Sequence, residues 1–296
     1  MQNCTEIAAG LWYLGGNDRR IALFESAYPV PRGVSYNSYL LKDEKNVLFD
    51  TVDNAVGELF FENLAFALDG GKLDYVVVQH MEPDHSATFA RLVELYPDVT
   101  VVTSQKAAAM LKNYFGFAGK THIVKEGDTL SVGKRTLTFV AAPMVHWPEV
   151  LFTYVPEDGI LFSADAFGTF GALSGSVFAD REIFEREFLD DARRYYFNIV
   201  GKYGVQVQSV LKKAAGLHIS LVCPLHGPVW KEGFGWYLDK YLTWSAYAPE
   251  ERCVAVFYAS VYGHTQNAAE IVASAIAAEG VRVKVCDVSV THASEL

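Results

Sequence analysis

The feature that most limits how this chain can fold is a dense run of metal-binding residue types directly after an apolar segment. Residues 80–86 read His-Met-Glu-Pro-Asp-His-Ser and follow residues 75–79, whose valines predict a buried strand. His80, Glu82 and Asp84 alternate by two, so an extended backbone would project all three to one side. The fold must therefore gather these groups at the mouth of a strand.

Two further residues of the run support this prediction. Pro83 favours an extended conformation at the residue before it, Glu82, and His85 directly precedes a predicted helix that begins near Ser86. Crowded carboxylates and imidazoles are costly to bury unless a cation compensates them. The run therefore predicts a metal site rather than a solvated polar turn.

Three more candidate ligands stand directly after predicted strands or at their ends, and they are His146, Asp165 and His226. Taken alone, a histidine at a strand end is more typical of a hydrogen-bonded structural residue. Taken with the first run, the set comprises four histidines, two aspartates and one glutamate. That number suits two metal ions that share one bridging carboxylate.

Short apolar runs separated by turn residues recur through the first 247 residues and predict a strand-rich α/β domain. The predicted strands are 11–14, 35–41, 46–50, 75–79, 100–103, 122–124, 136–141, 150–154 and 160–163. The predicted helices are 56–68, 86–96, 105–114, 181–200 and 205–215. Turn signals at 126–128 and 132–134 predict a hairpin. The order favours two sheets between helix layers over a simple alternation of strands and helices.

The chain changes character at residues 246–252, which are typical of a linker. A buried-strand pattern at 254–258, an alanine-rich helix at 266–279 and a second strand at 281–285 follow, and together they predict one parallel βαβ unit. One such unit cannot cover both faces of its sheet. We therefore predict two domains, 1–247 and 248–296, of which the second is incomplete.

The loop at 259–265 joins this strand to this helix and is rich in hydroxyl groups. Ser260, Tyr262 and Thr265, with backbone N–H groups at the helix N-terminus, can hold a phosphate dianion. The loop has no lysine, so it is not a Walker loop.

The composition excludes several classes of protein. A formal net charge of −10, without any run of lysine or arginine, argues against nucleic acid and anionic membranes as partners. No apolar run approaches the roughly 20 residues of a membrane span. The four cysteines form no C-x-x-C motif and are predicted to be free thiols in a reducing cytoplasm. We expect a cytoplasmic protein.

The spacing His-x-Glu-x-Asp-His, then His, Asp and His, resembles the metallo-β-lactamase fold. Hydrolases of that fold usually carry histidine where Glu82 stands. The glutamate and the flavodoxin-like start after it make the whole chain similar to the flavodiiron proteins, or A-type flavoproteins. The resemblance implies an αββα sandwich followed by the first βαβ unit of a flavodoxin-like doubly wound domain.

The resemblance also implies a ligand set and two cofactors, a diiron pair and FMN. One iron would be held by His80, Glu82 and His146, the other by Asp84, His85 and His226, with Asp165 between them. The hard oxygen of Glu82 favours iron over zinc. The FMN phosphate would lie on Ser260, Val261, Tyr262, Gly263, His264, Thr265, Gln266 and Asn267.

The activity implied by the resemblance is reduction of O₂ to water, of NO to N₂O, or of both, with electrons supplied through FMN. The implied partners are rubredoxin or a similar small donor and further copies of the chain in a head-to-tail homodimer or tetramer. Two alternatives stay open: a dinuclear zinc hydrolase, and a non-catalytic FMN electron carrier or gas sensor. We also expect 296 residues to hold FMN weakly.

Overall fold

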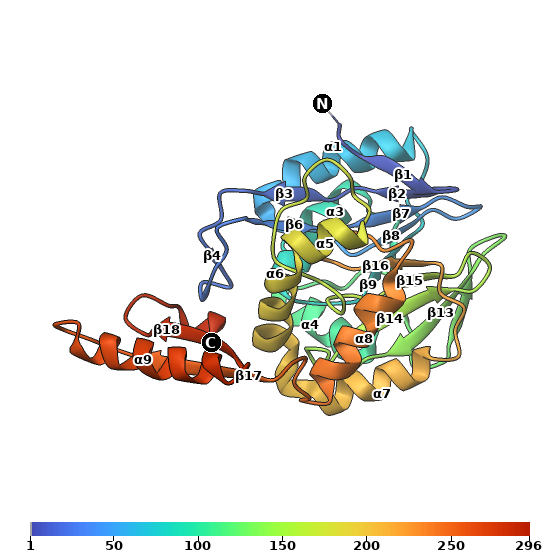
Figure 1. The fold of residues 1–296 in the computed structure, drawn as a ribbon. Helices are drawn as coiled ribbons and strands as arrows, with labels where there is room; N and C mark the ends of the chain where they lie inside the picture. Colours follow the sequence, from blue (N-terminus) through green and yellow to red (C-terminus); the bar gives the residue numbers. More distant parts are fainter. Residues whose placement is uncertain (1) are drawn as a thin grey trace.

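The computed structural model describes residues 2–296, and two β-sheets that pack face to face form its centre (Figure 1). The first sheet has the order β1 (Thr5–Ala8), β2 (Leu11–Tyr13), β7 (Tyr39–Leu41), β8 (Val47–Phe49), β9 (Tyr75–Val78), β10 (Thr100–Thr103) and β11 (Thr121–Ile123). The second has the order β12 (Thr129–Ser131), β13 (Thr136–Ala141), β14 (Leu151–Val155), β15 (Ile160–Phe162) and β16 (Leu221–Cys223).

Apolar side chains from both sheets fill the space between them. Phe49 of β8 stacks on Phe162 of β15 with ring centroids 3.7 Å apart, and both are fully buried. Strands β8 to β11 run parallel, as do β15 and β16, so their carboxyl ends meet at one edge of the sandwich. Ligands that follow such strands are thereby brought together.

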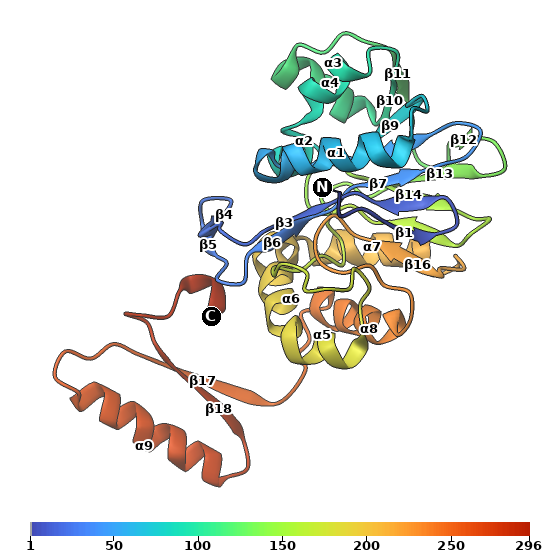
Figure 2. The same ribbon diagram turned by 90° about the horizontal axis from the view of Figure 1, so that it is seen from above.

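Helices cover both outer faces, as Figure 2 shows. The first sheet carries α1 (Gly57–Leu68), α2 (Pro83–Ser86), α3 (Phe89–Leu95) and α4 (Gln105–Phe115). The second carries α5 (Arg181–Glu187), α6 (Leu189–Tyr195), α7 (Gly204–Ala214) and α8 (Phe234–Ser245). Short helical turns lie at η1 (Asn54–Val56), η2 (Tyr196–Val200) and η3 (Gly201–Tyr203). This confirms the predicted sandwich between helix layers.

Several predicted bounds are wrong. Residues 35–41 form not one strand but parts of two, since β6 (Val34–Tyr36) pairs with β3 (Gly16–Asp18), whereas β7 joins the first sheet. Asn37 lies in the break between these strands, and its side chain donates to the carbonyls of Pro224 and Gly227 at 2.9 and 2.8 Å. A second small hairpin pairs β4 (Leu23–Phe24) with β5 (Tyr28–Pro29).

Two other predictions are wrong in part. Residues 181–200 form two helices and a π-helical turn rather than one helix. The turn at 132–134 does join the hairpin of β12 and β13, but residues 126–128 connect the two sheets instead. Helix α4 begins as expected, with the Ser104 hydroxyl accepting from the amide of Ala107.

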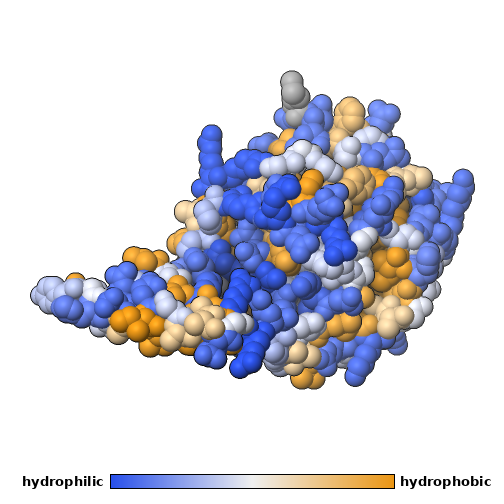
Figure 3. All heavy atoms as spheres, in the orientation of Figure 1, coloured by the Kyte–Doolittle hydropathy of each residue, from blue (hydrophilic) through white to orange (hydrophobic). Residues whose placement is uncertain are grey.

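The last residues form a separate βαβ unit that projects from the sandwich (Figures 1 and 2). Its strands β17 (Cys253–Tyr258) and β18 (Arg282–Asp287) are parallel, with α9 (His264–Ala278) between them, and η4 (Ala293–Glu295) follows. Figure 3 shows hydrophobic side chains on the surface of this arm, where Phe257 and Ile271 are 50% and 62% exposed. In residues 2–296 no helix combines the length and apolar character needed to cross a membrane.

One carboxylate ties the linker to the sandwich. Glu250 accepts from Arg193 at 2.6 and 3.1 Å, from the Lys240 ammonium at 2.6 Å and from the Trp244 indole at 2.7 Å. Charge-assisted bonds of this kind are stronger than neutral ones. They fix the chain where it leaves α8.

Candidate metal centre

A first group of four side chains meets at the edge of the sandwich. The Glu82 Oε2 atom lies 3.2 Å from Nε2 of His80 and 3.0 Å from Nε2 of His146. The Asp165 Oδ2 atom lies 3.1 Å from the same nitrogen of His146. One donor atom from each of the four lies within 4.8 Å of every other. This spacing can hold one metal ion.

A second group lies beside it. Nε2 of His226 is 3.1 Å from Oδ2 of Asp84 and 3.1 Å from Nε2 of His85. The three donor atoms again lie within 4.8 Å of one another. Two imidazole nitrogens that face each other at this distance suit a shared cation, which both can ligate.

Asp165 stands between the two groups. Its Oδ2 atom faces His146 and lies 3.4 Å from Nε2 of His80, while Oδ1 lies 3.1 Å from Nε2 of His85. One oxygen is thus presented to each group. This is the arrangement that a bridging carboxylate requires.

The local backbone differs from the extended segment predicted from the sequence. Glu82 is extended, with ψ 143°, but Pro83 begins helix α2, so Asp84 and His85 lie within a helical turn. Proline suits the first helical position because its fixed φ is already helical. The turn sends Asp84 and His85 to the second group and leaves His80 and Glu82 in the first.

The ligands come from both sheets. His80 follows β9 of the first sheet, whereas Asp165 and His226 follow β15 and β16 of the second. His146 lies in the connection from β13 to β14. The seven side chains predicted as ligands are all brought together at this seam.

The donor set fits metal ions. Three of the histidines, His80, His85 and His226, are at most 1% exposed, and Asp165 is 1% exposed. Buried oxygens of Asp84 and Asp165 face imidazole nitrogens but have no hydrogen-bond partner among residues 2–296. Burying carboxylates without compensation is costly. Divalent cations would supply the missing partners.

The charges in the site act on one another. Burial alone would lower the pKa of His80, but the carboxylates of Asp165, Glu149 and Glu82 raise it well above its usual value. Burial would also lower the pKa of His146. The carboxylates of Asp165 and Glu82 outweigh this effect and raise the pKa to about 9. A pocket that attracts protons this strongly also attracts cations, and metal binding would release those protons.

Sequence reasoning missed the residues that support the ligands. Glu149 accepts from Nδ1 of His80 at 2.9 Å, and the fully buried Asp50 accepts from the amides of Gln79 and His80 at 2.7 and 3.2 Å. The available signal for Asp50 was a lone acidic residue at the end of an apolar strand. Glu149 carried no comparable signal.

Aromatic rings and one hairpin surround the centre. Phe24 of β4 packs edge-on against His226 with centroids 5.4 Å apart, and Trp147 packs edge-on against His80 at 5.4 Å. Glu25, at the tip of the hairpin, was also missed by sequence reasoning. Burial and the neighbouring Glu82 carboxylate raise the pKa of Glu25 to about 8.

The predicted phosphate loop lies far along the chain, before α9. Ser260 Oγ accepts from the amide of Gly263 at 3.0 Å, and Gly263 has a φ of 84°. Within residues 2–296 no side chain caps α9, so its first amides are available to an anion. Val261 and Tyr262 are 87% and 88% exposed. The loop fits a phosphate but does not enclose a flavin ring.

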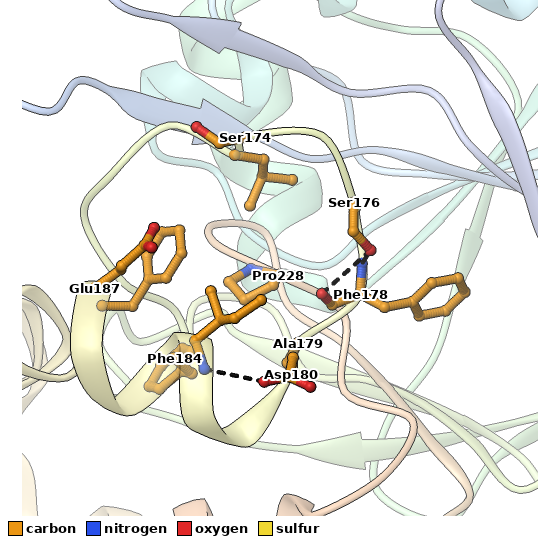
Figure 4. A pocket seen from close by; sticks show the side chains of 11 residues that line it. Ser174, Ser176, Phe178, Ala179, Asp180, Phe184, Glu187 and Pro228 are labelled. Atoms are coloured by element: carbon orange, nitrogen blue, oxygen red, sulfur yellow. Dashed lines mark hydrogen bonds between the residues drawn. The ribbon is translucent and has the colours of Figure 1, made fainter.

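Two cavities lie apart from these groups. One of about 160 Å³ lies between α5 and the segment before it, where Figure 4 shows Ser174, Ser176, Asp180 and Pro228 around it. Another of about 310 Å³ is apolar and lies beneath α7 and α8. Neither is lined by any of the seven ligand candidates.

Comparison with known proteins adds independent evidence. Residues 34–227 match the family model described as ODP family beta lactamase. The chain is 36% identical to an uncharacterized protein of Methanocaldococcus jannaschii over 98% of this chain and 73% of that protein. It is 33% identical to a nitric oxide reductase of Moorella thermoacetica over 100% of this chain and 74% of that protein. An anaerobic nitric oxide reductase flavorubredoxin of Aeromonas hydrophila is 34% identical over 94% of this chain and 57% of that protein.

Solved structures are similar over the same extent. The flavodiiron protein from Giardia intestinalis superposes with a TM-score of 0.94 at 29% identity, over 100% of this chain and 72% of that one. The rubredoxin oxygen:oxidoreductase from Desulfovibrio gigas superposes with a TM-score of 0.92 at 31% identity, over 99% of this chain and 74% of that one.

Proposed function

Since the chain belongs to the flavodiiron proteins, a family of oxidoreductases, we propose that it reduces O₂ to water, NO to N₂O, or both, at a non-haem diiron site. The observation that carries this proposal is the pair of ligand groups that share Asp165, with Glu82 in the first group. The relatives named above are longer than this chain, which spans 57% to 74% of their length.

The proposed ligands fall into the two groups described above. His80, Glu82 and His146 would hold one iron and Asp84, His85 and His226 the other, and Asp165, which faces both groups, would be shared between them. The three carboxylates bring hard oxygen donors and three negative charges, which favour iron over zinc. Bound iron would supply one-electron redox chemistry and positions open to a diatomic gas.

The remaining residues hold and shield this centre. Glu149 and the Ser35 carbonyl fix the rings of His80 and His226 through their Nδ1 atoms, at 2.9 and 2.8 Å. Phe24 and Trp147 place apolar surface against two of the ligands. Apolar walls exclude water and suit an apolar gas.

Electrons are proposed to arrive through FMN. The amides at the start of α9 and the hydroxyls of Ser260, Tyr262 and Thr265 would hold its phosphate. The loop lies on the projecting arm, which supports a head-to-tail homodimer in which it serves a second copy (Figure 2). The names of two relatives, a flavorubredoxin and a rubredoxin oxygen:oxidoreductase, support a rubredoxin-type donor. We propose a cytoplasmic location.

The proposal is tested by measuring first the metal content of the protein and then its consumption of each gas. The chain is purified without oxygen, loaded with Fe(II), and mixed with O₂ or NO while iron oxidation and gas uptake are recorded. We expect two irons per chain and uptake of at least one gas, with His122→Ala as a control because this histidine lies on the exposed strand β11. Two zinc ions after growth in iron-rich medium, with hydrolytic activity and no gas uptake, would instead establish the zinc hydrolase.

A further inference from the structure

The histidines of the two pockets differ in what lies behind them. His80 directs Nδ1 at the Glu149 carboxylate, 2.9 Å away, whereas His226 directs Nδ1 at the Ser35 carbonyl, 2.8 Å away. Nδ1 of His85 is buried and has no hydrogen-bond partner in the part of the chain that the structure describes. A carboxylate therefore supports a ligand of the first pocket, whereas in the described residues the one Nδ1 partner of the second pocket's histidines is the neutral Ser35 carbonyl.

Glu149 is placed to act on His80 at full strength. Its side chain is 0% exposed, and Oε1 also accepts from the amide of Met81 at 3.0 Å. Its second oxygen is buried and has no hydrogen-bond partner among the described residues. Water does not screen this carboxylate, so its charge acts on the neighbouring imidazole in a medium of low polarity.

This difference has an electronic consequence. A carboxylate behind a ligating imidazole fixes its orientation and makes it a stronger donor to the metal. Asp165 offers one oxygen to each pocket, and Glu82 and Asp84 give each pocket one further carboxylate. Glu149 therefore places a negative charge in direct hydrogen-bond contact with a ligand imidazole of the first pocket, and among the described residues no carboxylate does this at Nδ1 of His85 or His226. More negative charge and stronger donation favour the higher oxidation state of iron.

We propose that Glu149 is a positioning residue that makes the two iron positions unequal, so that the ferric ion of a one-electron-oxidised pair lies with His80, Glu82 and His146. One electron leaves the diferrous pair for a one-electron oxidant such as ferricyanide. No bond to a ligand forms or breaks, and the Nδ1 proton stays between His80 and Glu149. The inference rests on the proposed diiron function.

The test compares two isosteric variants in a redox titration followed by Mössbauer spectroscopy. Glu149→Gln keeps an acceptor for His80 and removes the charge, so the potential of the first oxidation step should rise. The range of potential over which the mixed-valent pair accumulates should narrow. The formation constant of this pair should fall about tenfold or more, the size of effect seen for other residues that support a metal ligand. Asp50→Asn is the control, because it removes a fully buried carboxylate that accepts from the backbone amides of Gln79 and His80 and, among the described residues, hydrogen-bonds to no ligand imidazole; it should not narrow the potential range of the mixed-valent pair.

Two results would overturn the proposal: Glu149→Gln shifting only the second step, or shifting both steps equally. Glu149→Asp keeps the charge and should preserve the order of the two oxidation steps. Because it shortens the side chain, this variant also separates the effect of charge from the effect of packing. A protein that carries zinc would show no redox steps. That result would refute the diiron function but would not test the role of Glu149. In that case release of metal to a chelator still tests Glu149, since Glu149→Gln should speed loss of one of the two ions by about 10- to 100-fold. Unchanged release of both ions would refute the role of Glu149.

Discussion

The linker clamp at Glu250 gives a prediction with a calculable size. Its neighbours Arg193, Lys240 and Trp244 lower the pKa of Glu250 from 4.5 to about 2, although burial alone would raise it. At about 1.4 kcal/mol for each tenfold change, this corresponds to about 3 kcal/mol. The side chain is 19% exposed, and solvent screening reduces the contribution to about 1–2 kcal/mol. Glu250→Gln should therefore lower the free energy needed to open the linker at pH 7 by about 1–2 kcal/mol.

The pH dependence follows from the direction of the shift. The pKa of Glu250 is lower in the folded protein, so its contribution is complete above about 4.5 and disappears as the pH falls towards about 2. Hydrogen exchange of the amides in residues 246–252 measures the effect. In Glu250→Gln exchange should be about 5- to 30-fold faster at pH 7, and this difference should shrink steadily below pH 4.5.

The matched control is the next residue. Glu251 pairs with Arg282 within the projecting arm, and its side chain is 49% exposed, so Glu251→Gln should leave exchange of the linker nearly unchanged. Equal exchange rates for wild type and Glu250→Gln at pH 7 would refute the clamp. A difference that persists undiminished at pH 2.5 would show that packing, and not charge, holds the linker.

The other predictions concern the metals and the flavin. Glu82→His should retain less iron and more zinc, because an imidazole replaces a hard oxygen donor; unchanged elemental content would remove Glu82 from the ligand set. Asp165→Ala should lose at least one metal and the magnetic coupling between the irons while the domain stays folded by circular dichroism, and persisting coupling would identify another bridge. FMN should bind the 296-residue chain weakly, because the phosphate loop leaves the ring exposed to water. Stoichiometric flavin absorbance after desalting would contradict this.

Much of the site could be predicted from the sequence because three of its seven proposed ligands occupy one kind of position. His80, Asp165 and His226 each follow a short apolar strand by two or three residues, and these strands end at one edge of the sandwich. A local pattern therefore carried three-dimensional information. The same holds for the βαβ unit, whose elements are all local.

The unpredicted features depend on contacts between distant residues. Glu149 meets His80 across 69 positions, and nothing near Glu149 in the chain indicates that partner. Helix α8 was missed because its start contains Gly235 and several aromatic residues, which are modest helix formers, although Tyr237, Tyr241 and Trp244 do follow a helical spacing. In each case tertiary packing decides the structure and local propensity does not.

The position of the metal ligands at the edge shared by the two sheets affects the cellular abundance of the protein. Since the ligands belong to strands of both sheets, metal ions would fasten the two halves of the sandwich at this edge. A metal present at about 1,000 times its dissociation constant stabilises the folded state by about 4 kcal/mol. Newly made chains that meet no iron would open more often at this edge and be degraded sooner. We therefore expect the abundance of the protein to follow the iron supply, even where its synthesis is constant.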